Sequence, residues 1–228
     1  QALRRHPTAH LPIIDEHVER MLAADVIEPA VSPWASNIVL IRKRDQSLRF
    51  CVDYRQLNGL SLNRDAYALP RTGDCLMSLG RAQFFSTLDL RSGYWQAEIL
   101  PEDRDKTSFV TRKGQFRFKV LSFGLANAPA LFQRLMDTVL SGLTWETCLV
   151  FLDDVLVFSS TFEEHVERLT AVFQRIATAG LKLHPLKCRL FQRKVVFLGH
   201  VVSGDGISPD PAKISAVETW PRPRNVTE

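Results

Sequence analysis

The sequence has few cysteines and no long hydrophobic run. Its four cysteines stand far apart, and no two of them form a CxxC pair: Cys51, Cys75, Cys148 and Cys188. Zinc sites and disulfide frameworks need cysteines in closer or patterned spacing, so we interpret these four as reduced thiols of an intracellular protein. No apolar stretch approaches the roughly 20 residues of a membrane-spanning helix. The N-terminal segment QALRRHPTAHLP has no hydrophobic signal region, so the sequence predicts neither secretion nor contact with a membrane.

The charge balance shows only a small excess of one sign. The 228 residues include 29 Lys and Arg against 25 Asp and Glu, which gives a net charge of +4. This mild basic bias allows a nucleic-acid partner but does not require one. With 45% hydrophobic and 24% charged residues, and without repeats or low-complexity tracts, the composition is that of an ordinary globular protein with enough material for a core.

Helical patterns occur in several parts of the chain. Apolar residues recur at helical spacing over 14–22. In NAPALFQRLMDTVLSG three apolar residues share one face of a predicted helix: Leu131, Leu135 and Val139. Thr161 and Glu164 have the spacing of a capping box, which predicts the start of another helix. The segment GISPDPAKISAVETWPRP, residues 206–223, is interpreted as the beginning of a further helix.

Strand patterns alternate with these helices. NIVLIRKRDQSLRFCVDYR predicts two strands joined around RDQS, a hairpin rich in basic residues. Further strands are predicted in FFSTLDL, QFRFKVL, KCRLFQ and VVFLGHVVS. Hairpins mixed with helices, rather than a regular βαβ repeat, indicate an α+β domain.

Two adjacent aspartates, Asp153 and Asp154, interrupt the apolar run CLVFLDDVLVFSS. Burying two ionised carboxylates without partners would be very costly. Neighbouring residues in mid-strand point to opposite faces, so we expect a hairpin in which 149–151 pairs with 155–158 and 152–154 form the tip. There both carboxylates can approach one point. A divalent cation is the obvious counter-charge, and Mg²⁺ prefers such hard oxygen ligands.

Asp89, in FFSTLDLRSGYWQ, resembles this pair because it also ends an apolar strand pattern before a turn. If the two strands are neighbours, Asp89 and Asp153 could bracket two metal ions, as phosphoryl or nucleotidyl transfer requires. The alternative from the residues alone is structural: Asp89 would cap a helix, and Asp153 and Asp154 would form a solvated turn.

Five segments, in this order and spacing, are similar to the reverse transcriptase of gypsy-type LTR retrotransposons: SPWASNIVLIRKRDQSLRFCVDYRQLN, STLDLRSGYWQ, FGLANAP, FLDDVLVFS and FLGHVVS. The similarity extends from about His10 to Pro223, and five motifs in series are far more specific than any one of them. The resemblance implies an α+β, right-hand polymerase fold with fingers, a palm built on a ferredoxin-like sheet, and a truncated thumb.

The resemblance also implies how the chain is divided. The fingers would comprise 1–80 and, as a second part, 103–120. The palm would comprise 81–102, with the first catalytic aspartate, and 121–204, with the FLDD hairpin and the primer grip; the thumb would start in 205–228. We expect either a segment of a longer pol polyprotein or a truncated product. The RNase H and integrase parts expected of such a polyprotein would lie outside this chain.

The family's catalytic carboxylates match Asp89, Asp153 and Asp154. The resemblance implies that these residues, with the main-chain carbonyl of Leu90, hold two Mg²⁺ ions, for which Mn²⁺ is a possible substitute. Lys43 and Arg49 match the basic pair that grips the incoming triphosphate, and Arg suits this role because its guanidinium binds phosphate oxygens in a bidentate manner.

Other positions match the family's substrate sites. The nucleotide site would be completed by a set of residues after the first aspartate and one in the FGLANAP motif: Leu90, Arg91, Ser92, Gly93, Tyr94 and Phe123. Tyr94 would lie beneath the sugar of the incoming nucleotide. Primer and template contacts are implied for Phe151, Gln133, Leu198, Gly199 and His200. Phe151 departs from the tyrosine that is usual in the family.

The function implied is an RNA-directed DNA polymerase that adds deoxynucleoside triphosphates to a primer annealed to an RNA or DNA template, in the cytoplasm and within a virus-like particle. Two other classes compete with it. An RNA-copying RNA polymerase is disfavoured by the aromatic Tyr94. An inactive or domesticated fragment that only binds nucleic acid is disfavoured by the complete set of three aspartates.

Overall fold

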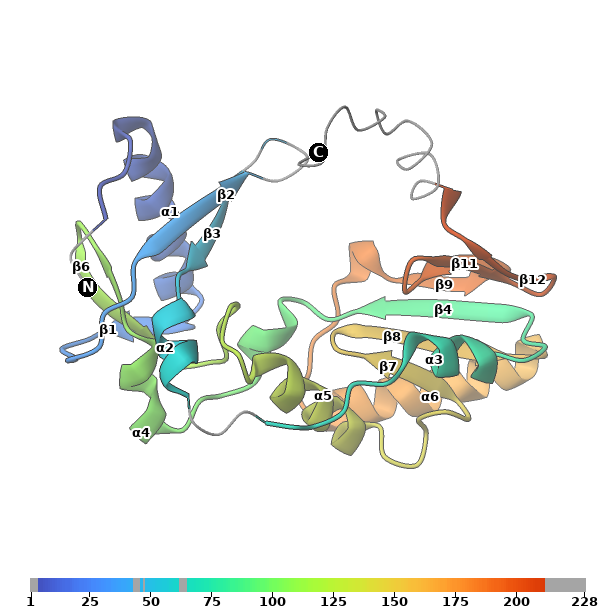
Figure 1. Ribbon diagram of the computed structural model, residues 1–228. Coiled ribbons are helices and arrows are strands. Elements are labelled where there is room, and N and C mark those ends of the chain that lie inside the picture. The colour runs from blue at the N-terminus through green and yellow to red at the C-terminus, as the bar shows by residue number, and fades with distance from the viewer. Residues whose placement is uncertain (1–3, 43–45, 47, 62–64, 212–228) are drawn as a thin grey trace, which may run out of the picture. The chain divides into compact units, whose positions relative to one another are not determined.

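The computed structural model describes residues 4–42, 46, 48–61 and 65–211 (Figure 1). The chain forms two compact units, and each unit is built from two stretches of sequence. The first unit comprises Gln1–Ala68 and Ser92–Arg134, and the second comprises Leu69–Arg91 and Leu135–Glu228. Within the described part of the chain, no helix has both the length and the apolar character needed to cross a membrane.

The first unit contains short helices and strands around one apolar core. Its elements are η1 Thr8–His10, α1 Leu11–Ala23, β1 Ile27–Pro29, β2 Ile38–Arg42, β3 Leu48–Val52, α2 Arg55–Leu60, η2 Gly93–Gln96, α4 Pro101–Arg104, η3 Asp105–Thr107, β5 Phe109–Thr111 and β6 Gly114–Phe118. Strands β1, β6 and β5 form a three-stranded sheet, and β2 and β3 form a separate antiparallel hairpin. The helix predicted over 14–22 is α1, whose apolar face is buried in the core.

The predicted basic hairpin is confirmed as β2 and β3, with Ile38 paired to Val52 and Arg42 paired to Leu48. Most of the residues that join the two strands, including Lys43, lie outside the described residues. The predicted role of Lys43 therefore stays a prediction.

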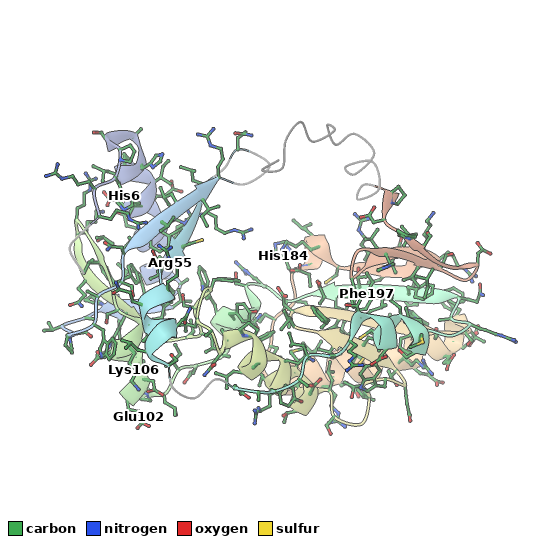
Figure 2. The ribbon with its side chains drawn as sticks, in the orientation of Figure 1. His6, Arg55, Glu102, Lys106, His184 and Phe197 are labelled. Atoms are coloured by element: carbon green, nitrogen blue, oxygen red, sulfur yellow. The ribbon has the colours of Figure 1, made fainter. Side chains whose placement is uncertain are left out.

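The second unit contains two sheets. Its elements are α3 Thr72–Ser78, β4 Phe84–Asp89, β7 Cys148–Phe151, β8 Asp154–Ser159, α6 Phe162–Thr178, η4 Pro185–Lys187, β9 Arg189–Gln192, β10 Lys194–Phe197, β11 His200–Ser203 and β12 Gly206–Pro209. One sheet has the order β7-β8-β4-β9, and the other has the order β10-β11-β12. An apolar cluster joins α3 to both sheets, and Phe197 of β10, labelled in Figure 2, belongs to it and is 4% exposed.

The order of elements through the four-stranded sheet is β4, α5 (Ala128–Val139), β7, β8, α6 and β9. This βαββαβ sequence, with β4 lying between β8 and β9, is the ferredoxin-like arrangement. The predicted α+β class with a ferredoxin-like sheet is therefore confirmed. Helix α6 begins where the capping box predicted, because Thr161 Oγ1 accepts a hydrogen bond from the Glu164 amide at 3.2 Å.

The segment 206–223, predicted as the beginning of a helix, starts with a strand. Residues 206–209 form β12, and Ile207 pairs with Val202 of β11. Residues 212–223 lie outside the described residues, so the helix predicted there stays a prediction.

The helix predicted in NAPALFQRLMDTVLSG is α5, and the face of Leu131, Leu135 and Val139 is partly exposed. The fully buried apolar side chains of this helical segment are those one position later: Phe132, Met136 and Leu140.

Candidate active site

Asp89 and Asp154 lie directly opposite each other at the end of two paired strands. Asp89 is the last residue of β4, Asp154 is the first residue of β8, and the antiparallel register makes them partners. Residues paired in this way project from the same face of a sheet. The predicted neighbourhood of the two strands is thus present, and the strand partner of Asp89 is Asp154.

The turn between β7 and β8 is shorter than the sequence suggested. Phe151 pairs with Asp154, so only Leu152 and Asp153 form the tip, and Leu152 adopts a left-handed backbone with φ 57°. Asp154 therefore belongs to the strand, and Asp153 stands beside it at the exposed turn. The hairpin brings the two adjacent carboxylates to one strand end without burying either completely.

The face on which Asp89 and Asp154 lie is set by the alternation of side chains along each strand. Phe85 of β4 and Leu156 of β8 occupy the same face and belong to the apolar cluster that includes Val195 and Phe197 of β10. The two carboxylates therefore point toward the side of the sheet that β10 covers.

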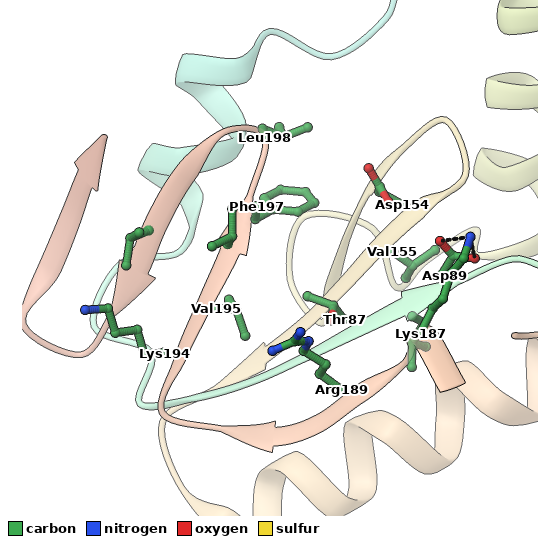
Figure 3. A pocket seen from close by; sticks show the side chains of 13 residues that line it. Thr87, Asp89, Asp154, Val155, Lys187, Arg189, Lys194, Val195, Phe197 and Leu198 are labelled. Carbon is green, nitrogen blue, oxygen red and sulfur yellow. Dashed lines mark hydrogen bonds and ion pairs between the residues drawn. The ribbon is translucent and has the colours of Figure 1, made fainter. Parts of the chain in front are cut away.

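A pocket of about 360 Å³ opens on this face (Figure 3). Its lining combines both paired carboxylates with basic and apolar side chains: Thr87, Leu88, Asp89, Asp154, Val155, Lys187, Arg189, Lys194, Val195, Val196, Phe197, Leu198 and Val201. Thus acidic groups at the strand ends and cationic groups on the neighbouring segments share one cavity.

Negative charge accumulates at this end of the sheet. Loss of water raises the pKa of Asp154 above its ordinary value, and the charges of Asp153 and Asp89 raise it further, while Lys187 acts in the opposite direction. Lys187 Nζ lies 3.3 Å from each carboxylate oxygen of Asp89, as the dashed lines in Figure 3 show. The ion pair of Lys187 with Asp89 therefore balances only part of the charge of the three aspartates.

The backbone of Asp89 is also tied down. The amide of His184, labelled in Figure 2, donates a 2.8 Å hydrogen bond to the Asp89 carbonyl. Leu90, which is 1% exposed, forms an isolated antiparallel bridge with Leu183. The segment that leads to Lys187 thus holds the end of β4 in place. Sequence reasoning missed Lys187, because nothing in the sequence links it to a residue 98 positions earlier.

The donor set suits a hard divalent cation, although no coordination geometry is present. Among the described residues, no three His, Cys, Asp or Glu side chains are gathered closely enough to hold a metal ion. The carboxylates are nevertheless oxygen ligands of the type that Mg²⁺ prefers. The pKa of Asp154 is raised first by loss of water and then by the charges of Asp153 and Asp89, which Lys187 opposes. In chemical type and charge, Asp89, Asp153 and Asp154 fit a divalent cation.

The LGH motif forms the turn between β10 and β11. Leu198 and Gly199 both have positive φ, 48° and 75°, as a two-residue hairpin turn of the primed type requires. His200 starts β11, and its Nδ1 lies 3.2 Å from the Leu198 carbonyl. Leu198 lines the pocket that contains Asp89 and Asp154, so the structure brings this predicted residue together with the carboxylates.

In the first unit, three aromatic rings form a contiguous group. The ring centroid of Tyr94 lies 5.0 Å from that of Phe123 and 5.3 Å from that of Phe132, both in edge-to-face geometry. Phe123 is 48% exposed, Tyr94 is partly buried and Phe132 is fully buried. Gln133, beside Phe132 on α5, is also fully buried. Tyr94 and Phe123, which were predicted separately, thus contact each other.

The remaining predicted residues have varied settings. Arg49 is exposed on β3, where it pairs with Ile41. Arg91 is exposed, Ser92 has φ 53°, and Gly93 is buried. Phe151 is partly buried at the end of β7. These residues flank the carboxylates in sequence or belong to the first unit. Of the residues predicted to bind nucleotide, primer or template, Leu198 is the one that lines the described pocket together with Asp89 and Asp154.

Comparison with known proteins identifies relatives over almost the whole chain. The chain is 37% identical over 227 residues to the Pol polyprotein of transposon 297 from Drosophila melanogaster, which covers 96% of this chain and 21% of the relative. It is 36% identical over 216 residues to the Pol polyprotein of transposon gypsy from the same organism, which covers 92% of this chain and 21% of the relative. The chain therefore spans about a fifth of the length of these relatives.

The fold agrees with solved structures. A foamy viral protease–reverse transcriptase in complex with double-stranded DNA superposes with a TM-score of 0.90 at 25% identity, covering 100% of this chain and 47% of that one. The same kind of protein in complex with an RNA/DNA hybrid gives 0.88 at 25% identity, covering 98% of this chain and 30% of that one. The sequence profile described as "Reverse transcriptase (RNA-dependent DNA polymerase)" matches residues 41–202. With its FLDD hairpin set against Asp89 in a ferredoxin-like sheet, the chain belongs to this reverse transcriptase family.

Proposed function

We propose that this chain is an RNA-directed DNA polymerase core, which adds deoxynucleotides to the 3′-hydroxyl of a primer by two-metal nucleotidyl transfer. The observation that carries the proposal is the pairing of Asp89 with Asp154, beside Asp153, at the edge of one pocket. The solved relatives that hold double-stranded DNA and an RNA/DNA hybrid support a primed template as the partner. The greater length of the relatives supports further parts in a parent polyprotein. We propose that these parts include RNase H and integrase and that the polyprotein acts in the cytoplasm.

The three aspartates and the carbonyl of Leu90 are the proposed metal ligands. When bound there, Mg²⁺ supplies charge neutralisation for the attacking hydroxyl and for the departing pyrophosphate. Asp89 and Asp154 hold their carboxylates at fixed positions because both lie in paired strands. The exposed ion pair of Lys187 with Asp89 contributes at most about 1 kcal/mol, so a divalent cation can displace it.

The other proposed roles concern the substrates. Arg49, together with Lys43, binds the triphosphate, since a guanidinium offers two parallel donors to phosphate oxygens. The Leu198–Gly199 turn positions the primer end through its backbone. Tyr94 and Phe123 support the sugar of the incoming nucleotide, and their mutual contact restrains both rings. Phe151 and Gln133 contribute to the template side.

The test is primer extension on poly(rA)/oligo(dT) with dTTP and Mg²⁺, comparing the unsubstituted chain with Asp153→Asn. This change removes one charge while keeping the size of the side chain, so we expect extension to fall below detection. We also expect an unchanged or higher melting temperature, because like-charge repulsion is relieved. Asp205→Asn, an exposed position in the turn between β11 and β12, is the matched control and should retain activity. Substantial extension by Asp153→Asn would contradict the assignment of the carboxylates.

A further inference from the structure

We propose that Asn58 is a positioning residue for sugar discrimination, because it clamps the turn that presents Phe123 to Tyr94. The inference rests on the proposed function and extends it to a residue in α2 that does not itself contact the nucleotide. It starts from a side-chain amide that reaches a turn more than 60 residues away in the sequence.

Both ends of the Asn58 amide are engaged by the same turn. Nδ2 donates a 2.9 Å hydrogen bond to the carbonyl of Gly124, and Oδ1 accepts a 2.9 Å hydrogen bond from the amide of Ala126. One partner requires a donor and the other an acceptor, so the orientation of the amide is determined. Aspartate could serve only one of these partners, and leucine could serve neither.

Asp65, which follows Asn58 in the sequence, binds the other end of the turn. The amide of Asp65 donates to Asn127 Oδ1 at 3.2 Å. The carboxylate oxygens of Asp65 accept from Arg134 NH2 at 2.7 and 2.9 Å, and the Arg134 guanidinium lies 4.8 Å from the centroid of the Tyr67 ring. The turn over residues 123–127 is thus held at one end by Asn58 and at the other by Asp65.

The clamp restrains the turn on the side away from β3. Gly124 has φ 94°, and a Cβ atom added there would lie 3.4 Å from the carbonyl of Val52 and 3.6 Å from the Tyr54 ring, so the backbone passes close to the end of β3. Movement of the turn away from β3 is opposed by the two hydrogen bonds of Asn58.

Phe123 directly precedes Gly124, so the clamp determines where its ring lies. The Tyr94 ring contacts Phe123 on one side and the fully buried Phe132 on another. Phe132 cannot move easily because it is enclosed, whereas Phe123 is half-exposed and depends on its backbone for position. Loosening the turn would release Tyr94 from its contact with Phe123 and would widen the space beneath the sugar.

The experiment measures two quantities in Asn58→Leu and Asn58→Asp. The first is the ratio of kcat/KM for dTTP to that for UTP in primer extension. We expect this ratio to fall about tenfold in both variants, the factor that corresponds to lost hydrogen bonds of ordinary strength, with a smaller loss for dTTP itself. The second is the hydrogen-exchange rate of the Ala126 amide, which should rise in Asn58→Leu and stay closer to that of the unsubstituted chain in Asn58→Asp.

Gly59→Ala is the matched control, because it lies on the same helix and an added Cβ would meet no atom within 4 Å. Its ratio and its exchange rate should equal those of the unsubstituted chain. The positioning role would be overturned if the Ala126 amide of Asn58→Leu exchanged as slowly as in the unsubstituted chain. It would also be overturned if that amide exchanged faster while the ratio of kcat/KM for dTTP to that for UTP stayed unchanged. If the unsubstituted chain does not extend primers at all, the proposed function fails, whereas the exchange rates still decide whether the clamp exists.

Discussion

Asp89 and Lys187 illustrate how individual side chains prepare this site. The Asp89 side chain is 27% exposed and that of Lys187 is 60% exposed, so their ion pair is accessible to water and readily exchanged. Lys187 is therefore a counter-charge for Asp89 that a bound cation can replace. Such a pair keeps the carboxylates from repelling one another strongly while no cation is bound.

Tyr94 gives a prediction at the scale of one residue. A 2′-hydroxyl would collide with a ring placed beneath the sugar, and packing penalties of this kind correspond to about 10- to 200-fold discrimination. We expect Tyr94→Val to increase the use of GTP relative to dGTP by a factor in this range, as measured by the two kcat/KM values. Tyr94→Phe keeps the ring and its contacts with Phe123 and Phe132, so it should retain the discrimination.

The thermal midpoint separates this role from a purely structural one. Tyr94 is partly buried, so its truncation leaves a cavity and lowers the free energy of unfolding. The loss is about 3–5 kcal/mol for a fully buried aromatic residue, which sets the upper end for Tyr94. A Tyr94→Val variant with a lowered midpoint and an unchanged nucleotide ratio would mean that the ring serves only the core.

Among the larger elements, α6 is joined to the central sheet by a buried histidine. His165 is fully buried, with Ser86 Oγ of β4 2.7 Å from Nε2 and Ser159 Oγ of β8 2.9 Å from Nδ1. Ser159 donates its own proton to the Thr161 carbonyl, so it must accept from Nδ1–H. Nε2 is then the acceptor for Ser86, whose oxygen accepts from the amide of Phe191 in β9. With His165 neutral, each donor in this hydrogen-bond network of β8, β4 and β9 has an acceptor.

This network predicts a pH-dependent stability. Burial lowers the pKa of His165 below its ordinary value of 6.5, Arg168 lowers it further, and Glu164 partly opposes this. The groups that reach the ring from β4 and β8 are the neutral hydroxyls of Ser86 and Ser159. Because the folded-state pKa is depressed, the unfolded chain takes up the proton first as the pH falls. The stabilisation is therefore complete above about pH 6.5 and is lost as the pH decreases through the folded-state pKa.

The measurement is the free energy of unfolding by urea at pH 8 and pH 5.5, for the unsubstituted chain and for His165→Asn. We expect the variant to be less stable at pH 8, with a smaller difference between the two proteins at pH 5.5. A difference that does not change with pH would show that His165 does not titrate differently in the two states. His6, whose pKa is also lowered by burial, is present in both proteins and cancels in the comparison.

The elements also show where sequence reasoning succeeds. Helix α1 and the hairpin of β2 and β3 follow from local periodicity, and the capping box located the start of α6. In α5, apolar residues occupy two adjacent stripes, so the buried stripe was decided by packing partners that the sequence does not show. Strand β12 was missed because its stability comes from pairing with β11, while its serine and its proline are typical of the start of a helix.

The candidate site was predictable to a similar degree. The three aspartates were found because charge within apolar strands is unusual, but the register that pairs Asp89 with Asp154 depends on a turn of two residues rather than three. Lys187 and Asn58 escaped notice, since each acts on a partner that is far away in the sequence. Contacts of this kind arise only from the tertiary fold.

For the whole molecule, the excess of positive charge predicts how nucleic acid binds. The net charge is +4, and the cations Lys187, Arg189 and Lys194 line the pocket beside the acidic residues. Contacts with phosphate release counterions, so the affinity should fall steeply as salt increases, with a log–log slope of about −0.9 for each phosphate neutralised on a duplex. Fluorescence anisotropy with a labelled RNA/DNA hybrid at several NaCl concentrations measures this slope. An affinity independent of salt would contradict a phosphate-dominated interface.

The position of β4 in its sheet has a consequence for synthesis of the chain on the ribosome. Strand β4 is made first, but both of its neighbours are made later, because Asp89 pairs with Asp154 and Thr87 pairs with Arg189. Until those residues have emerged, both edges of β4 remain unpaired, and such edges favour association with other chains. Closing contacts across so many residues is also slow. The carboxylates of Asp89 and Asp154 therefore meet only late in folding, and a nascent chain that ends before residue 154 has not yet assembled the candidate site.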